Sequence, residues 1–582
     1  MSKQEHALFQ KHSARLHAAL QALRQRSYWA AFQDSPNAKT YGEGAMDAGA
    51  RAFKSLRGTR FVLDQPGQSG WAGAEISPYS GALEVQYPVC AADALLAAGQ
   101  RAMLCWQAAG LRARLGLCLE MVEQLNAQSF LLAHAVMHTT GQGWMMAFQA
   151  GAAHAQERAL EALACAYAAQ SEVPGSARWA KPLGRQGTLL LEKRFELLGR
   201  GPALVLGCST FPTWNTYPGL FAALATGNSV IVKPHENAIL PAALTVRALR
   251  ATLAEWGLDA DLVTLFVPTA PEETRALATH SALRSIDYTG SSSFGRWLQQ
   301  NCRHAQVYAE LAGVNCVVLD STDDYAGMLR NLAFSLALYS GQMCTTPQTL
   351  FVPETGLATD QGCVSFAQVC ADLVGALQGV TADASSACAV LGAIQSNATL
   401  QRIALANSGA LGEVLLPSRP VVHAQYPQAR VQTPVLLRCA EALSAPGDSA
   451  QKDSAAWAQE QFGPISFVVR APDSACAIAW VEHLASTRGA LGCSLYSTRA
   501  QVLAGMTAAC WRAKVALSVN LTGPVHLNQS AAFSDFHGTG ANPAGNAAYT
   551  DLAFVAQRFC VVQQRTQAAV GQAVHGGANR GL

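Results

Sequence analysis

Charge is scarce in this sequence. Of its 582 residues only 14% are charged, and 41 Lys and Arg nearly balance 39 Asp and Glu, which leaves a formal net charge of +2. A nucleic-acid-binding chain needs a basic face to neutralise phosphates, so the composition excludes nucleic acid as an expected partner. The hydrophobic fraction of 50% instead predicts folded domains with buried cores. A chain of this length holds about two to four of them.

Cysteine pairs and long apolar runs are also missing. The 16 Cys include no CxxC pair and no Cys/His group with zinc-finger spacing, which predicts a reducing compartment and no metal site. His134 and His138 have the spacing of a metalloprotease helix, but the glutamate of HExxH is missing, and we interpret them as scaffold. No stretch resembles a signal peptide or reaches the roughly 18 apolar residues of a membrane span. We therefore expect a cytoplasmic protein with no membrane partner.

The spacing of apolar residues changes along the chain. Residues 1–80 form an N-terminal extension rich in turn signals, and Ala/Leu-rich helical patterns follow to about residue 170. A second α/β region runs from about residue 322 to 520. Between them, short apolar runs alternate with helical patterns: ALVLGC (203–208), SVIVK (229–233), DLVTLFV (261–267), RSIDYT (284–289) and NCVVLD (315–320). This alternation predicts an α/β fold with a doubly wound parallel sheet, which holds a nucleotide at the carboxyl ends of its strands.

Two segments at such strand ends could contact a nucleotide. Gly290 and Ser291 open GSSSFGR, where a strand, a Gly/Ser turn and a helix start bring backbone N–H groups and a helix dipole towards an anion. Arg296 stands where a Walker A motif has Lys-Ser/Thr, and an ordinary glycine-rich turn is the alternative. Lys233 and Glu236 follow SVIVK and could reach ribose hydroxyls, with a solvated charged loop as the alternative.

Cys344 and Glu310 are candidates for covalent chemistry. Cys344 follows a helical run in SGQMCTT, and Glu310 ends a short strand in YAELAG. A thiolate can form an acyl intermediate, and a carboxylate can activate the water that removes it. The alternatives are an apolar filler for the thiol and a structural ion pair or helix cap for the carboxylate.

Five fragments in a fixed order resemble the aldehyde dehydrogenase superfamily over about residues 85–565. They are ATGNSVIVKPHE (225–236), YTGSSSFGR (288–296), ELAG (310–313), GQMC (341–344) and EQFGP (460–464). The resemblance implies an NAD(P)-binding domain over 81–320 with a bridging hairpin near 186–199. It also implies a catalytic α/β domain over 321–520, a C-terminal return with an oligomerisation strand over 521–565, and a flexible tail over 566–582. A homo-oligomer, at least a dimer, is expected.

The same resemblance assigns roles to individual residues. Cys344 matches the nucleophile that attacks an aldehyde, and Glu310 matches the base that hydrolyses the resulting thioester. The implied cofactor is NAD or NADP: Glu236 favours NAD because a carboxylate repels a 2′-phosphate, whereas related CoA-semialdehyde dehydrogenases often accept NADP. The implied contacts are Lys233 and Glu236 at the adenosine ribose, Gly290 and Ser291 at the pyrophosphate, Glu460 at the nicotinamide ribose, and Phe462 beside the nicotinamide ring.

The chain departs from the family pattern where an asparagine amide usually holds the substrate oxyanion. Counting back from Lys233 without gaps places Thr210 at that position. Asn215 lies five residues later, and we expect it inside a helix on a different face. Loss of an oxyanion donor can cost about 10²- to 10³-fold in rate. We therefore expect a compensating group or slow turnover.

The C-terminal segment AAFSDFHGTGANPAGNAAYTDLAFVAQRF lacks the family's PFGGxKxSG loop. With CSTFPTWN and the long extension, it resembles the PaaN branch, phenylacetate-degradation proteins related to the dehydrogenase part of PaaZ. That branch implies a small-molecule aldehyde substrate, a ring-opened CoA-linked semialdehyde of aromatic catabolism, that is oxidised to the acid. Two alternatives remain open: an acylating enzyme that passes the thioester to CoA, and a non-catalytic member that acts as a binding or scaffold subunit.

Overall fold

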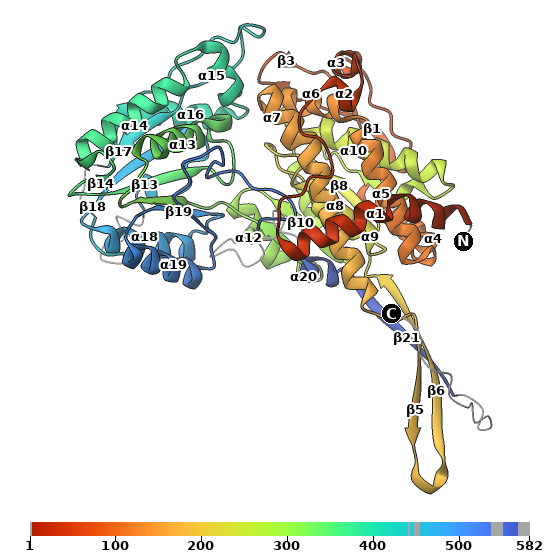
Figure 1. Ribbon diagram of the computed structural model, residues 1–582. Helices are drawn as coiled ribbons and strands as arrows, with labels where there is room; N and C mark the ends of the chain where they lie inside the picture. The colour runs from red at the N-terminus through yellow and green to blue at the C-terminus, as the bar shows by residue number, and fades with distance from the viewer. Residues whose placement is uncertain (1–2, 440–442, 447–453, 537–550, 568–582) are drawn as a thin grey trace.

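The computed structural model describes residues 3–439, 443–446, 454–536 and 551–567. Figure 1 shows two α/β bodies side by side and a long hairpin that projects from the first of them. The first body contains a five-stranded sheet and the second a seven-stranded sheet.

The five-stranded sheet is parallel throughout, with strand order β11-β10-β7-β8-β9. Its strands are apolar along most of their length because helices cover both faces. The order reverses at β7, whose neighbours are β8 on one side and β10 on the other, so a crevice opens beyond the strand ends there. The predicted doubly wound sheet is confirmed. Its elements are β7 (Ala203–Leu206), α9 (Thr216–Ala225), β8 (Val230–Lys233), α10 (Ile239–Glu255), β9 (Val263–Leu265), α11 (Pro271–Ala278), β10 (Ser285–Thr289), α12 (Ser292–Asn301) and β11 (Gln306–Glu310).

The second sheet has the order β16-β17-β18-β13-β12-β19-β20 and is parallel except for the edge strand β16. The segment NCVVLD forms β12 in the middle of this sheet and does not continue the first one, so the change of body lies within 311–314 and the boundary expected at residue 320 is corrected. The strands are β12 (Asn315–Leu319), β13 (Pro347–Pro353), β16 (Glu413–Leu416), β17 (Val435–Arg438), β18 (Ile465–Ala471), β19 (Cys493–Tyr496) and β20 (Leu517–Val519).

Helices flank the second sheet on both sides (Figure 1). Among the residues that the structure describes, no single helix is long and apolar enough to cross a membrane, although α14 and α15 pass that test together as a pair bent by 100°. The helices of this body are α13 (Tyr325–Ala337), α14 (Phe366–Val380), α15 (Ala384–Leu391), α16 (Asn397–Asn407), α18 (Ser474–Thr487) and α19 (Ala500–Ala513).

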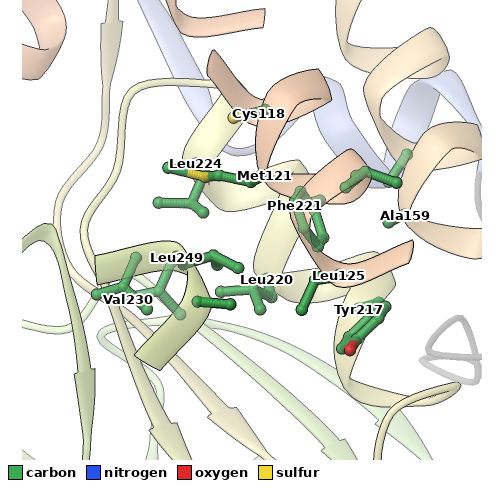
Figure 2. Close-up of a cluster of buried hydrophobic side chains, with 14 of the residues drawn as sticks. Cys118, Met121, Leu125, Ala159, Tyr217, Leu220, Phe221, Leu224, Val230 and Leu249 are labelled. Carbon is green, nitrogen blue, oxygen red and sulfur yellow. The ribbon is translucent and has the colours of Figure 1, made fainter. Parts of the chain in front are cut away.

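The N-terminal extension is part of the first body and shares its core. Helix α1 (Lys3–Gln25) packs on α5 (Gly110–Asn126) and α8 (His154–Ser171), and its Leu16 and Ala19 are fully buried. Figure 2 shows the continuation of this core, in which α5 and α8 pack on α9 through Met121, Phe221 and neighbouring apolar side chains. The other helices of this region are α3 (Ala45–Leu56), α4 (Ala92–Ala108), α6 (Ser129–Thr140) and α7 (Trp144–Phe148).

The projecting hairpin consists of β5 (Ser176–Pro182) and β6 (Thr188–Gly199), and β21 (Phe559–Gln567) pairs antiparallel with β6 (Figure 1). It begins well before the position expected near residue 186. Because β21 continues to Gln567, the predicted flexible tail cannot begin at residue 566. Residues 568–582 of that tail and 537–550 of the C-terminal return lie outside the described residues.

Candidate active site

A cleft of about 800 Å³ opens at the carboxyl end of the five-stranded sheet and is closed on one side by residues of the second body. It is the position that the strand order predicts for a ligand. Every residue that the sequence proposed for catalysis or cofactor binding lines this one cleft: Thr210, Lys233, Glu236, Gly290, Ser291, Glu310, Cys344, Glu460 and Phe462.

Cys344 lies on a tightly held loop between a short helical turn and β13. Tyr339 and Ser340 have positive φ angles of 54° and 49°, which is uncommon for residues with side chains, and both are buried. A Cβ on Gly341 would lie 2.2 Å from the carbonyl oxygen of Gly463, so only glycine fits there. Asn315 Nδ2 donates to the carbonyl oxygens of Cys344 at 2.8 Å and Thr346 at 3.0 Å. The sequence around the cysteine therefore fixes its position.

Glu310 is the last residue of β11 and is 1% exposed. Its carboxylate lies near the thiol of Cys344 in the cleft, close enough to raise the pKa of that thiol. Burial, and then the negative charge of Glu310, raise the pKa of the Cys344 thiol well above its usual range. The resting site therefore keeps the proton on the sulfur, near a carboxylate that can accept it.

The loop after β7 brings a second sulfur to the cleft. Thr210 is buried, and its carbonyl oxygen accepts a 2.8 Å hydrogen bond from Gln142 Nε2. Cys208 also lines the cleft, and burial raises the pKa of its thiol. Asn215 is not turned away as expected: it occupies the N-cap position of α9, lines the cleft, and its Nδ2 lies 3.2 Å from Cys208 Sγ. Sequence reasoning missed Cys208, although its position directly after an apolar strand was a usable signal.

The far end of the cleft is formed by the residues after β8. Lys233 ends that strand, and burial lowers its pKa while the charge of Glu236 opposes the shift. His235 lies between them in sequence, and burial followed by the charge of Lys233 lowers its pKa to about 4, so it is neutral at pH 7. This uncharged imidazole was not among the predicted site residues.

The N-terminal extension supplies one wall of this end. Residues 72–74 line the cleft, and Glu75 follows them as a buried side chain. Its Oε1 accepts hydrogen bonds from Ile239 N at 2.6 Å and Leu240 N at 3.0 Å, which caps the start of α10. Burial raises the pKa of Glu75 to about 7. The extension therefore shapes a cleft that sequence analysis assigned only to later segments.

Gly290 and Ser291 stand where β10 leads into α12. A Cβ on Gly290 would lie 2.5 Å from Tyr288 Oη, and a Cβ on Gly295 would lie 2.0 Å from Leu311 Cδ2, so both glycines permit close packing of the turn and helix. Ser291 is the N-cap residue and lines the cleft, and the first N–H groups of a helix have no intrahelical partners. This geometry suits a phosphate group.

Glu460 and Phe462 approach from the second body. Burial raises the pKa of Glu460 to about 7, against an opposing hydrogen bond from the backbone N–H of Gly313 and the charge of Arg402. Arg402 Nη2 also donates to the carbonyl oxygen of Phe462 at 2.7 Å. The Arg402 guanidinium therefore holds residues 460–462 beside Cys344. Glu460, Phe462 and Cys344 line the same part of the cleft.

His134 and His138, which we interpreted as scaffold, pack against aromatic side chains. His138 Nδ1 lies 3.0 Å from Ser77 Oγ, and its ring stacks on Phe53 with centroids 4.6 Å apart. His134 stacks on Phe53 and contacts Trp144. Within the described ranges, no group of three or more His, Cys, Asp or Glu side chains is placed to hold a metal ion.

The chain belongs to the aldehyde dehydrogenase family, whose model matches residues 74–525. An NAD-dependent aldehyde dehydrogenase from Burkholderia multivorans, known from a crystal structure, is 49% identical; the match covers 97% of this chain and 100% of that one, with a TM-score of 0.93. These similarities confirm the predicted aldehyde dehydrogenase-like α/β fold.

Other relatives are more distant. A 1-pyrroline-5-carboxylate dehydrogenase from Thermus with bound NAD is 16% identical, with 93% of this chain and 99% of that one covered and a TM-score of 0.69, which shows a shared fold. Alpha-ketoglutaric semialdehyde dehydrogenase 2 of Azospirillum brasilense is 36% identical over 163 residues, 26% of this chain. The match spans only 31% of that relative's length.

Proposed function

We propose that this chain is an NAD(P)-dependent aldehyde dehydrogenase that converts an aldehyde to a carboxylic acid through a thioester on Cys344. The observation that carries the proposal is that the Cys344 thiol and the Glu310 carboxylate line the same cleft, close enough for the carboxylate to raise the pKa of the thiol. A nucleophile and a base that face the same cleft are what covalent acyl chemistry requires. Family membership and the Burkholderia structure support the same reaction class.

The residues of the cleft fit a nicotinamide dinucleotide. Lys233 and Glu236 offer polar groups to the hydroxyls of one ribose, and the start of α12 offers N–H groups to a pyrophosphate. Glu460 lines the cleft with Cys344 and offers a carboxylate to the second ribose. When bound, the nicotinamide supplies the acceptor for the hydride that leaves the substrate carbon. Glu236 favours NAD over NADP, because its carboxylate would lie next to a 2′-phosphate.

The chain's own groups perform the remaining steps. Glu310 accepts the proton of Cys344, and the sulfur bonds to the aldehyde carbon, which places a negative charge on the aldehyde oxygen. The Cys344 N–H and the Thr210 hydroxyl are the donors implied for that oxygen. Glu310 releases that thiol proton to solvent, and after oxidation of the carbon the thioester is attacked by a water whose proton passes to the ionised Glu310. The carbon–sulfur bond breaks, the acid leaves, and the sulfur regains a proton.

The substrate we propose is a ring-opened, CoA-linked semialdehyde of aromatic catabolism. Its support is the resemblance of the 208–215 segment and the C-terminal region to the PaaN branch. Phe211 gives the cleft an apolar wall, and Met343, which packs against its cluster, lines a small adjoining pocket with Cys344; such a surface suits an aldehyde with a hydrocarbon body. Two rivals remain: transfer of the thioester to CoA, and a non-catalytic binding role.

A panel of aldehydes tests these alternatives. Absorbance of reduced cofactor is followed with simple aldehydes and CoA-linked semialdehydes, with NAD or NADP, and with or without free CoA. The proposal expects acid as the product and no acyl-CoA. An acyl-CoA product indicates the acylating rival, and binding of NAD without reduction by any aldehyde indicates the non-catalytic one.

We also propose a homo-oligomer of at least two subunits. The sheet formed by β5, β6 and β21 projects from the body and carries exposed apolar side chains, namely Trp179 at 38%, Val561 at 45% and Val562 at 49% exposure. An open strand edge with apolar residues is suited to pairing with another chain. Light scattering on the full chain measures the mass, and a monomer at micromolar concentration contradicts the proposal.

A further inference from the structure

Asn215 combines two features that its position in the helix pattern did not suggest. It is 6% exposed and lines the catalytic cleft together with Thr210 and Cys344. One end of its side-chain amide contacts Cys208 Sγ at 3.2 Å, and the other end is buried without a hydrogen-bond partner.

An unpartnered amide in a buried site is costly. Leaving one such polar group unpaired costs about 1–3 kcal/mol, and buried groups of this kind are rare unless they serve a ligand. The two ends of the amide exchange places by a half-turn about χ2. In one orientation the NH₂ donates to Cys208 sulfur; in the other the oxygen accepts the thiol proton and the NH₂ is the end without a partner.

The structure has the first orientation, and the chemistry of Cys208 also permits the second. Burial, and the nearby charge of Glu310, keep the Cys208 thiol protonated at neutral pH. A protonated thiol can donate to the amide oxygen, although weakly. The same charge disfavours a second negative group in the cleft, so Cys208 is suited to anchoring the amide and poorly suited to being a second nucleophile.

We propose that Asn215 is a catalytic residue that donates a hydrogen bond from its NH₂ to the aldehyde oxygen when Cys344 adds to the carbonyl carbon. Cys208 is its positioning residue. The donor compensates for the presence of a threonine at the position where the family pattern has an amide. This inference rests on the proposed function, because it presumes that Cys344 is the nucleophile. Asn215 transfers no proton or other atom. Its hydrogen bond stabilises the oxyanion that forms together with the new carbon–sulfur bond.

The test compares two reactions of the same sulfur in the full-length protein. Hexanal with NAD⁺ gives a pre-steady-state burst that requires an oxyanion, whereas alkylation of Cys344 by iodoacetamide does not. Asn215→Leu removes the donor, and Asn215→Asp keeps the size of the side chain but replaces the donor with an acceptor. The matched control is Asn301→Leu at the exposed carboxyl end of α12.

We expect Asn215→Leu and Asn215→Asp to slow the burst about 10²- to 10³-fold, while alkylation and NAD⁺ affinity stay within about twofold of the parent protein. Cys208→Ala slows the burst less, because it loosens the amide without removing it. An unchanged burst in Asn215→Leu overturns the inference. So does a parallel loss of burst and alkylation in both variants, which indicates a structural role. If Asn215→Leu does not fold, the burst rate of Asn215→Asp alone tests the inference. A burst that survives in Cys344→Ala instead rejects the proposed function.

Discussion

The carboxylate of Glu310, at the end of a strand in one sheet, lies near the thiol of Cys344, which is three residues before a strand of the other sheet, and raises the pKa of that thiol. The proposed nucleophile and base therefore come together only where the two bodies meet. Each body contributes one of the two side chains. A small change in how the bodies pack therefore changes the distance between the proposed nucleophile and base.

The first prediction concerns the pKa of the nucleophile. In Glu310→Gln the neighbouring negative charge is gone, so the pKa of the Cys344 thiol falls from its raised value. The rate of iodoacetamide alkylation, measured against pH, should rise at lower pH than in the parent protein. The burst of reduced cofactor should persist while steady-state turnover stalls, since the thioester is no longer hydrolysed. An unshifted alkylation profile would contradict the contact.

The second prediction concerns the pH dependence of cofactor binding. The pKa of Glu460 is about 7, so its carboxyl is mostly protonated at pH 6 and mostly ionised at pH 8. The ionised form accepts hydrogen bonds from ribose hydroxyls more strongly, and NAD⁺ affinity should therefore increase as the pH rises through 7. Fluorescence titration measures this slope. In Glu460→Gln the slope should disappear, and a slope that stays the same assigns it to another group.

The third prediction concerns a glutamine that joins the two bodies. Gln395 Nε2 donates to the carbonyl oxygens of Thr139 at 2.8 Å and Ser209 at 2.9 Å, and Ser209 precedes Thr210 in the cleft loop. Gln395→Leu leaves both carbonyl groups short of a buried donor, which should lower the free energy of unfolding by about 1–3 kcal/mol. Chemical denaturation measures this change.

The burst rate of Gln395→Leu should fall as well, because the loop that carries Thr210 loses its anchor. Gln368→Leu provides the matched control, since Gln368 is exposed and its amide bonds only to Asp372 among the contacts seen on α14. Equal stability of the two variants would show that the bridge is not important.

The fourth prediction concerns the turn before α12. In Gly290→Ala the added carbon would lie 2.5 Å from Tyr288 Oη, so the turn must shift away from the phosphate position. NAD⁺ affinity should fall at least about tenfold, a loss of about 1.4 kcal/mol. Alkylation of Cys344 should not change.

Gly375→Ala is the control for this glycine, because it lies in α14 with open space around the added carbon. It should bind NAD⁺ like the parent protein. If both alanine variants bind equally well, the turn does not hold a phosphate.

The sequence pattern predicted the site residues whose positions depend on their immediate neighbours in the chain. Lys233 and Gly290 were found because apolar strands ending in a charged or glycine turn mark the carboxyl edge of a parallel sheet. The strand 315–319 was found as a strand and assigned to the wrong sheet, since its apolar residues fit either one and the choice depends on partners distant in sequence.

The missed residues depend on distant contacts in the same way. The wall formed by 72–74 is held by Glu75, which reaches the start of α10 more than a hundred residues later. Asn215 was expected to turn away because we assumed that it lay inside a helix, whereas α9 begins only at Thr216 and Asn215 is its cap. One irregular turn was enough to bring its amide to the cleft.

Intact mass spectrometry of Glu310→Gln, mixed with hexanal and NAD⁺ and quenched in acid, tests the thioester most directly. We predict a mass increase equal to one hexanoyl group, which peptide mapping places on Cys344 and which Cys344→Ala does not show. An unmodified chain after cofactor reduction, or the acyl group on any other residue, would contradict the account.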